Sequence, residues 1–465
     1  MKTQREIRSA AFVLAFLCLV GSLRADHDYT AWEDYTANPL VDPGSRADYP
    51  SVLYDYEAFG VSGGATWRMW YGASGTLRMV TSSDGLAWGS SVSATGLTNP
   101  GHAKVLYDAD GFGITGGAPY RVWYWTSNMT YTLDDLHTAQ SSDGIDWDDD
   151  QAVTQSSSNP LITGMSGTGW NRGSYGPACV LYQPGASNSG TDPWDYRFVM
   201  YYDGTSGGTE SLGLAYSSDG IDWTAYSTSA VLPYGGSGSW DAAYATFGTV
   251  FRDENGYHLW YSGGQSASHE GIGYASSPDG LTWTKDANNP LFAVGGSAPT
   301  YRAGRAYTPD VILAPDGSLR MYYGGSPTGS GSDLRICLAR DLTPLLVELV
   351  SFEALPCQGG VRLDWVTETE IRNAGFHLWR AESEEGPYAR ITETLIPGRG
   401  QSEISGAAYT FTDPGVFPRT RYWYRLEDVE DTGARTFHGP VSVMVPWAPA
   451  PPRNGNPAAA SGEVP

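Results

Sequence analysis

Four acidic side chains stand where they could do chemistry, at the starts of apolar strands or in the loops between them. These candidate catalytic carboxyls are Asp48, Glu210, Asp241 and Glu270. Two carboxyls cleave a glycosidic bond when one is protonated and donates to the leaving oxygen while the other is ionised and acts as base or nucleophile. The required separation is about 5–5.5 Å for retention or about 6.5–9.5 Å for inversion. The fold must therefore bring together acids that are far apart in sequence.

Seven further side chains stand in the same kinds of segment and suit the binding of a polar ring compound through hydrogen bonds or stacking. They are His102, Trp170, Arg172, Tyr175, Trp240, Tyr307 and Asp310. Trp170 and Trp240 are the expected stacking platforms, because most other tryptophans occupy repeated positions that indicate packing. His102 and His269 lack the spacing of metal ligands. We expect no metal site and no cofactor among these residues, and the sequence leaves open an axial Ca²⁺ ion.

One phrase recurs four times and organises most of the chain. It reads SSDGLAW at 82–88, SSDGIDW at 141–147 and 217–223, and SSPDGLTW at 276–283. A repeat of this size favours a propeller or a solenoid. The aspartates of the phrase (Asp84, Asp143, Asp219 and Asp279) are expected to form tight Asp-Gly turns and not to be catalytic.

Two more phrases precede each copy and define a four-stranded unit. An alternating β-branched phrase comes first, as in PSVLYD at 50–55, and an aromatic phrase follows, as in RMWY ending at Tyr71. Each unit then reads strand A, turn, strand B, loop, strand C, Asp-Gly turn and strand D, which is the pattern of a propeller blade. Five such pairs of phrases predict five blades.

The fifth blade lacks its own fourth strand, and the N-terminal segment offers a replacement. Trp32 is followed six residues later by Asn38-Pro39-Leu40, just as Trp283 is followed by Asn289-Pro290-Leu291. We therefore expect residues 31–41 to form the outer strand of blade five and to close the ring. The expected fold is all-β, a five-bladed β-propeller over residues 26–344.

After about residue 345 the pattern changes to alternating strands at the spacing of a β-sandwich. The region 345–447 resembles a fibronectin type III-like module, with Trp365 as the expected core aromatic and the strand containing Tyr422 and Tyr424 opposite it. The tail 448–465 is rich in Pro, Ala and Gly and is expected to be disordered.

The first 25 residues read as an export signal, with basic residues followed by the apolar run from Ala10 to Gly21. That run is too short to span a bilayer, so we expect a bacterial-type, secreted or extracytoplasmic chain without membrane insertion. The net charge of −23 disfavours nucleic acid as a partner. Three cysteines remain after cleavage, too few for a disulfide framework. The chain is expected to act as a monomer.

Antiparallel order fixes which loops share a face of the predicted propeller. The connections from strand D to strand A and the loops between strands B and C crowd the axial mouth, and the Asp-Gly turns lie on the opposite face. All the candidate residues above, with Asp134, Asp135 and Asp203, fall in or beside segments at the mouth. The mouth is thus the expected site.

The repeats resemble those of the five-bladed glycoside hydrolases, the arabinanase, β-xylosidase and invertase group. The resemblance covers 31 to about 343. It implies an acid at the start of strand A in blades one, two and three. This chain has Asp48 in blade one, His102 in blade two and Gly176 in blade three, so the proton-donating role would pass to Glu210 or Glu270. Two hypotheses follow: a hydrolase acting on arabinan- or xylan-like carbohydrate, and a non-catalytic carbohydrate-binding or surface interaction propeller.

Overall fold

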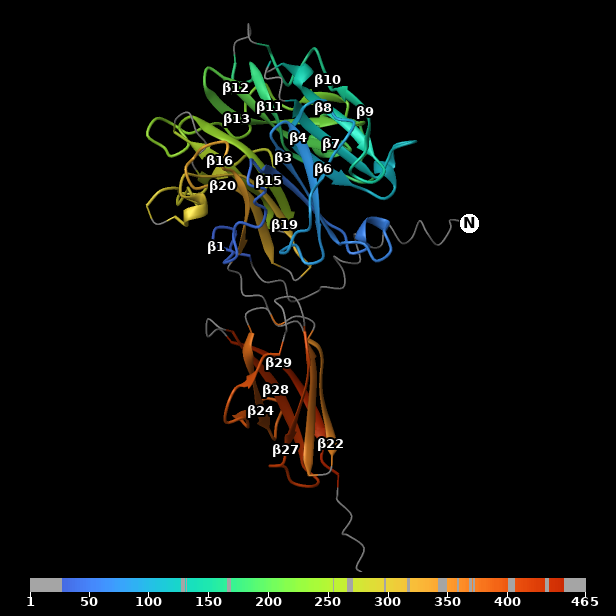
Figure 1. Cartoon of the computed structure of the whole chain (residues 1–465). Coiled ribbons are helices and arrows are strands. Elements are labelled where there is room, and N and C mark those ends of the chain that lie inside the picture. Colours follow the sequence, from blue (N-terminus) through green and yellow to red (C-terminus); the bar gives the residue numbers. More distant parts are fainter. Residues whose placement is uncertain are drawn as a thin grey trace, which may run out of the picture. The chain divides into compact units, whose positions relative to one another are not determined.

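The protein is described from a computed structural model (Figure 1). The structure describes residues 27–126, 130, 132–164, 169–253, 255–265, 271–296, 298–315, 318–341, 349–357, 359–367, 370, 373–399, 406–430 and 435–446. The chain forms two compact units, one over Asp26–Thr343 and the other from Pro344 onward. In the described part of the chain, no helix has the length and apolarity needed to cross a membrane.

The first unit consists of five antiparallel sheets, as the repeats predict. The strands of the first three are β2 (Asp48–Tyr54), β3 (Trp67–Ala73), β4 (Thr76–Ser82) and β5 (Val92–Ser93); β6 (Pro100–Tyr107), β7 (Tyr120–Thr126), β8 (Leu136–Ser141) and β9 (Trp147–Ala152); and β11 (Gly173–Tyr182), β12 (Phe198–Ser206), β13 (Thr209–Ser217) and β14 (Asp222–Ala225), with β10 (Thr154–Gln155) parallel to β14.

The last two sheets of this unit carry the same strand order. Their strands are β15 (Tyr244–Asp253), β16 (Gly256–Gly264), β17 (Gly271–Ser277) and β18 (Thr284–Lys285); and β19 (Arg305–Leu313), β20 (Leu319–Ser326), β21 (Arg335–Asp341) and β1 (Trp32–Asp34). A single parallel bridge between Glu210 and Tyr244 links the third sheet to the fourth.

The N-terminal strand completes the fifth sheet. Trp32 pairs with Asp341, and Val41 bridges Ile336 further along the same edge. Asn38 exchanges two hydrogen bonds with the backbone of Leu338, and Asn289 makes the same pair of bonds with the backbone of Tyr274 in the fourth sheet. The segment therefore occupies the position of a strand D, as predicted from its Asn-Pro-Leu phrase.

The innermost strands contact one another in a cyclic order, β2 with β6, β6 with β11, β11 with β15, β15 with β19 and β19 with β2. An aromatic side chain on strand B of one sheet also donates a hydrogen bond to the Asp-Gly turn of the next. The bonds run from Trp70 Nε1 to Gly144 O, Trp123 Nε1 to Gly220 O, Tyr201 OH to Gly280 O and Tyr322 OH to Gly85 O. The last bond joins the fifth sheet to the first.

The repeated aspartates hold turns. In the first sheet, Asp84 Oδ1 accepts hydrogen bonds from the backbone N–H groups of Leu86 and Ala87, and Ser82 Oγ accepts from Gly85 N–H. The other three copies repeat these bonds. Burial raises the pKa of Asp84, Asp143 and Asp219, but the hydrogen bonds that the carboxylates accept outweigh it, and the pKa of all four turn aspartates is lowered.

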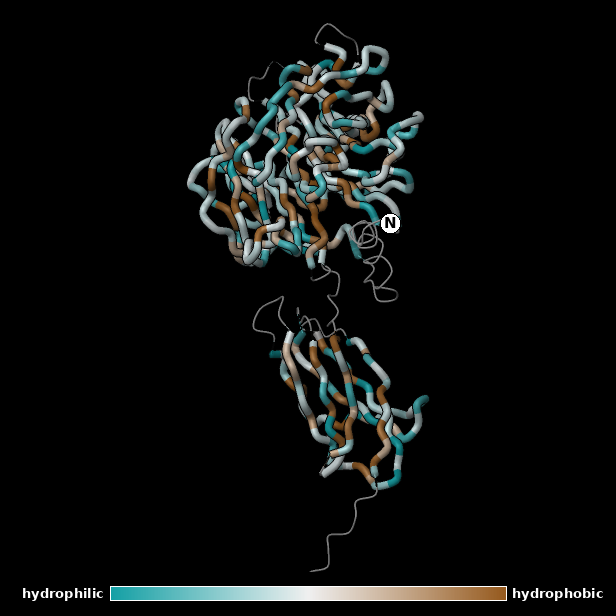
Figure 2. Tube along the Cα trace, turned by 90° about the vertical axis from the view of Figure 1, so that its right-hand side faces the viewer, coloured by the Kyte–Doolittle hydropathy of each residue, from teal (hydrophilic) through white to brown (hydrophobic). Residues whose placement is uncertain are grey.

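The second unit is a two-sheet sandwich. One sheet contains β22 (Leu349–Cys357), β23 (Gly360–Thr367) and β27 (Ala408–Asp413). The other contains β25 (Ala389–Arg390), β24 (Asn373–Ala381), β28 (Arg421–Glu430) and β29 (Arg435–Met444), with β26 (Ile396–Pro397) beside β24. Trp365 packs in the core with Tyr422 and Tyr424, as expected. Hydrophobic and hydrophilic residues intersperse along the strands of both units (Figure 2).

Candidate functional site

The five innermost strands share an irregularity near their starts. Each contains a shift in pairing register, for example between Asp48 and Ser51 on β2 and between Tyr307 and Asp310 on β19. Tyr49 and Thr308 have φ values of 51° and 53° at these shifts. A bulge of this kind redirects side chains locally. It sets the directions of the residues that face the axis.

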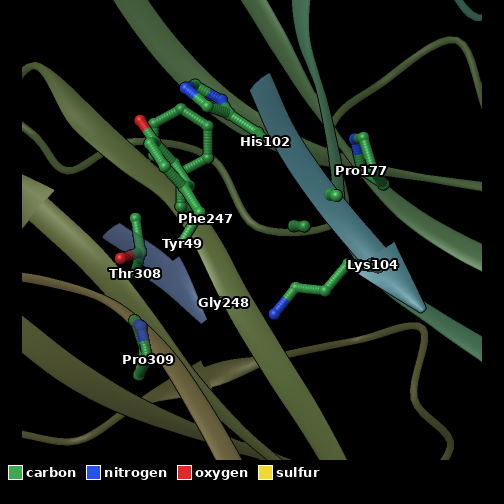
Figure 3. A pocket seen from close by; sticks show the side chains of 10 residues that line it. Tyr49, His102, Lys104, Pro177, Phe247, Gly248, Thr308 and Pro309 are labelled. Atoms are coloured by element: carbon green, nitrogen blue, oxygen red, sulfur yellow. The ribbon is translucent and has the colours of Figure 1, made fainter. Parts of the chain in front are cut away.

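Three rings, from the innermost strands β2, β6 and β15, lie close together, as Figure 3 shows. Tyr49 stacks on His102 with ring centroids 3.4 Å apart, and Phe247 meets both rings edge-on at 5.3 and 5.1 Å. We call Tyr49, His102 and Phe247 the aromatic plug. The cavity lined by the plug with Thr308 and Pro177 has a volume of about 10 Å³, enough for roughly one water molecule.

Asp48 lies beside the plug in a buried network of charged and polar groups. Its Oδ2 accepts hydrogen bonds from Arg46 Nε at 2.7 Å and from the Tyr307 hydroxyl at 2.7 Å, and its side chain is 2% exposed. Burial raises the pKa of Asp48, while the Arg46 charge and these hydrogen bonds oppose that rise. Two of the expected site residues, Asp48 and Tyr307, are therefore in direct contact.

Glu210 lies beside a second buried carboxyl. It hydrogen-bonds to Asp203, whose other partner is the hydroxyl of Thr246 on β15. Both acids are buried. Burial raises the pKa of Glu210 to about 8, and the hydrogen bond with Asp203 opposes that rise. A hydrogen bond between two carboxyls requires a proton on one of them, and the raised pKa of Glu210 favours the protonated form of that residue.

Tyr49 connects the two acid clusters. Its pKa lies well above the usual value, mainly because its phenol is buried, and the charges of Asp48 and Glu210 raise it further. Both acids are thus near enough to act electrostatically on the same ring. The structure brings Asp48, His102 and Tyr307 to the starts of the innermost strands, and it places Glu210 of β13 beside Tyr244 at the start of β15.

Asp310 lies in a polar layer further along these strands. Its Oδ1 is 2.8 Å from Lys104 Nζ, and its Oδ2 accepts a hydrogen bond from Val52 N–H. Lys104 also donates to the carbonyl of Pro50. Both oxygens of Asp310 are therefore engaged inside the ring, and the Lys104 ammonium supplies a positive charge on the axis.

Trp170, Trp240 and Asp241 lie on the third and fourth sheets and do not line the plug cavity. A Cβ on Gly204 or Gly213 would lie within 2.5 Å of the Trp170 ring, and one on Gly263 or Gly273 equally close to Trp240. The Asp241 carboxylate contacts Lys285 Nζ at 2.5 Å and the Tyr261 hydroxyl at 3.1 Å. One face of each indole is thus covered by its own sheet, and Asp241 is held in a buried ion pair.

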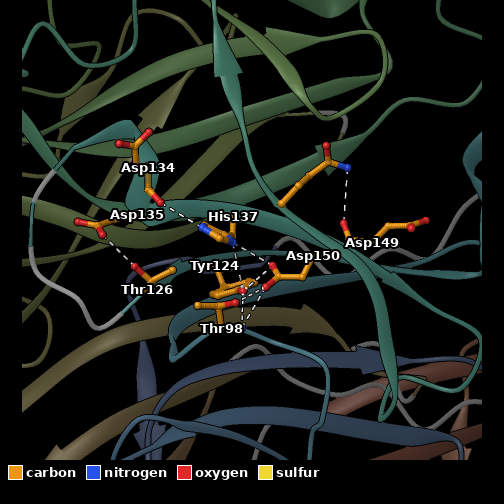
Figure 4. A network of polar contacts seen from close by, with 9 residues as sticks. Thr98, Tyr124, Thr126, Asp134, Asp135, His137, Asp149 and Asp150 are labelled. Carbon is orange, nitrogen blue, oxygen red and sulfur yellow. Dashed lines mark hydrogen bonds and ion pairs between the residues drawn. The ribbon is translucent and has the colours of Figure 1, made fainter.

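Asp134 and Asp135 belong to a network in the second sheet, drawn in Figure 4. Asp135 accepts from the Thr126 hydroxyl, and the backbone carbonyl of Asp134 contacts His137 Nε2. The other ring nitrogen of His137 lies 2.9 Å from Asp150, which also accepts from Tyr124 and Thr98. These contacts join β7, β8, β9 and the preceding connection.

The remaining expected residues are described in part. Glu270 and the side chain of Tyr175 lie outside the described residues, and so does His269. Arg172 precedes β11 and is half-buried. In the parts of the chain that the structure describes, no three His, Cys, Asp or Glu side chains gather as metal ligands would.

Sequence reasoning missed Arg46, Tyr49 and Phe247. Tyr49 and Phe247 each directly precede the alternating phrase of strand A, at the position that His102 occupies in the second sheet. Aligning the five phrases one residue further upstream would have identified this ring. The sequence analysis placed Asp203 among the acids of the mouth but did not predict its contact with Glu210. That contact depends on the tight turn from β12 to β13.

No protein-family model matches the sequence, and no curated protein matches it. Among solved structures, a member of the GH130 family of mannoside phosphorylases, which contains glycoside hydrolases that target β-1,2 mannosidic linkages in Candida mannan, is 17% identical. The alignment covers 69% of this chain and 96% of the other, with a TM-score of 0.47.

Two other solved structures are also similar to this chain. A GH32 β-fructofuranosidase from Bombyx mori, in complex with sucrose, is 12% identical over 96% of this chain and 94% of its own, with a TM-score of 0.40. An Fn3-like protein from Clostridium thermocellum is 20% identical over 22% of this chain and 94% of its own, with a TM-score of 0.16. Glycoside hydrolases and an Fn3-like protein, the classes that the sequence resembles, are both among the similar solved structures.

Proposed function

We propose that this chain is an exported, carbohydrate-active hydrolase whose reaction takes place at the axial mouth beside the aromatic plug. The observation that carries the proposal is the raised pKa of Glu210, about 8, at the same mouth as Asp48. A general acid must carry its proton at the working pH, and a buried carboxyl with such a pKa does so at neutrality.

The two acids take different roles because their surroundings differ. Glu210 has a carboxyl neighbour and donates the proton to the leaving oxygen. Burial raises the pKa of Asp48 as well, but the Arg46 guanidinium at 2.5 Å and the phenol donor of Tyr307 favour its ionised form, so Asp48 takes the role of base or nucleophile. Glu270 keeps its place as an alternative acid, and Arg172 and Tyr175 as groups that bind the sugar.

The substrate class follows from the resemblance of the repeats, and we propose an arabinan- or xylan-like polysaccharide. The export signal and the acidic surface support work outside the cytoplasm, where polymeric carbohydrate is accessible. The chain would act as a monomer and without a metal ion.

The second candidate function is carbohydrate binding without catalysis. The aromatic plug favours it, because the rings fill the axis and leave about 10 Å³ between them. In this alternative the acids at the mouth are buried structural groups, and Trp170 and Trp240 serve as platforms at the rim.

A screen of the purified mature chain on arabinan, arabinoxylan and neutral control polysaccharides tests the proposal. We expect release of reducing ends that falls by about 100-fold or more in Asp48→Asn, since that is the usual loss when an essential carboxyl is removed. Asp364→Asn, on the exposed face of β23, is the matched control and should leave the rate unchanged. Retention on the polysaccharide without any release of reducing ends would favour the binding function.

A further inference from the structure

The sandwich sheet β25–β24–β28–β29, three of whose strands are labelled in Figure 1, has one face toward the core and one outer face. Tyr422, Tyr424 and Leu426 of β28 point into the core. Because side chains alternate along a strand, the odd-numbered residues of β28 point outward. The pairing register then places Trp379 of β24 opposite Arg425 and Arg435 of β29 opposite Val429 on this face.

Guanidinium groups and aromatic rings alternate across this face. Arg425 lies over the Tyr388 ring at 4.3 Å, and Arg421 lies over the Trp423 ring at 6.0 Å. The ring of Trp379 meets that of Phe437 at 5.7 Å, and Phe437 is 50% exposed. We call this set the arginine–aromatic face; its members are Trp379, Tyr388, Arg390, Arg421, Trp423, Arg425, Arg435 and Phe437.

The face carries a strong excess of positive charge. Among the described outward-pointing side chains of these four strands, Glu427 is the one carboxylate, and it is 1% exposed. Glu427 accepts from Trp379 Nε1 at 2.9 Å and contacts Arg435 at 3.3 Å. Four arginines against one engaged carboxylate are exceptional in a chain whose net charge is −23.

We propose that the arginine–aromatic face binds an acidic polysaccharide, one whose sugar units carry carboxylates. A guanidinium pairs with a carboxylate through two parallel hydrogen bonds, and the apolar side of a sugar ring stacks on an aromatic ring. In such a polymer, sugar rings alternate with carboxylates. On the arginine–aromatic face, aromatic rings alternate with guanidinium groups, so the two patterns are complementary. This inference is independent of the reaction proposed for the propeller.

Retention of the mature full-length chain on immobilised polygalacturonate tests the proposal. We expect binding that weakens as salt is raised, because exposed charges are screened. Arg425→Gln combined with Arg435→Gln should weaken binding by about tenfold or more, the loss expected when two charge-assisted contacts are removed. The matched control is Arg362→Gln, an exposed arginine on β23 of the other sheet, which should bind as the wild type does.

Three results would overturn the proposal. Equal retention of the double variant and the wild type would place binding elsewhere, and equal affinity for polyglutamate would show that the sugar rings are not recognised. An oligomer in solution that the double variant abolishes would assign the face to a second copy of the chain. Asp48→Asn should leave retention on polygalacturonate unchanged, so a failed hydrolase proposal and a failed binding face give different results.

Discussion

The hydroxyl of Tyr322 in the fifth sheet donates a hydrogen bond of 2.8 Å to the carbonyl of Gly85 in the Asp-Gly turn of the first. The two residues are 237 positions apart in sequence, and the contact repeats the bonds that join the first sheet to the second, the second to the third and the third to the fourth. In the fourth sheet, Trp260 Nε1 donates instead to Tyr29 O of the N-terminal segment.

Removing the Tyr322 hydroxyl should weaken the link between the last and first sheets. Tyr322→Phe leaves the buried Gly85 carbonyl without this donor, so we expect a loss of about 1–3 kcal/mol in the free energy of unfolding. Urea denaturation measures the change, with Tyr56→Phe as the matched control because Tyr56 is 62% exposed. Equal stability of the two variants would show that this bond contributes nothing to the ring.

Deleting the N-terminal strand should destabilise the whole propeller. Asp34 of β1 contacts Arg302 at 2.7 Å and also accepts from Tyr323, and Trp32 packs edge-on against Trp260. Loss of residues 27–41 would expose the edge of β21, and a free edge pairs readily with other chains. We expect a lower melting temperature and oligomers by size-exclusion chromatography. A truncated chain that stays monomeric with an unchanged melting temperature would contradict the role assigned to β1.

Much of this architecture could be predicted from the sequence, because repeated phrases carry it. The Asn38 and Asn289 phrases make the same backbone hydrogen bonds. The position of the Asn289 phrase in blade four therefore predicted the position of the Asn38 phrase in blade five. The turn aspartates could be predicted for the same reason, since their partners lie two or three residues away.

The site could be predicted only in part, since its contacts join residues from different sheets. Asp48 meets Tyr307 across 259 positions, and Thr246 meets Asp203 across 43. The bulges that turn Tyr49 and Phe247 toward the axis leave no clear mark in a hydrophobic pattern. Asp241 stands before a strand A in the sequence, as Asp48 does. Its ion pair with Lys285 depends on the folded fourth sheet, so the sequence alone did not indicate it.

The raised pKa of Glu210 should make stability depend on pH. Its pKa is about 8 in the folded protein against about 4.5 for an unperturbed glutamate. Between these values the folded state binds more protons than the unfolded state, so the free energy of unfolding falls as pH rises from about 4.5 to 8.

Glu210→Gln should remove this contribution. The variant should lose less stability than the wild type between pH 5 and 8, as followed by denaturation midpoints at several pH values. Parallel curves for the two proteins would mean that Glu210 titrates at its ordinary pKa.

The most direct test of the central claim, that Glu210 is the proton donor at the mouth, compares two leaving groups. Glu210→Gln is assayed on the oligosaccharide that the wild type cleaves and on the corresponding dinitrophenyl glycoside, whose leaving group needs no proton. We predict a loss of about 100-fold or more on the oligosaccharide, with the rate on the aryl glycoside largely retained. Equal rates of wild type and variant on the oligosaccharide would contradict the account.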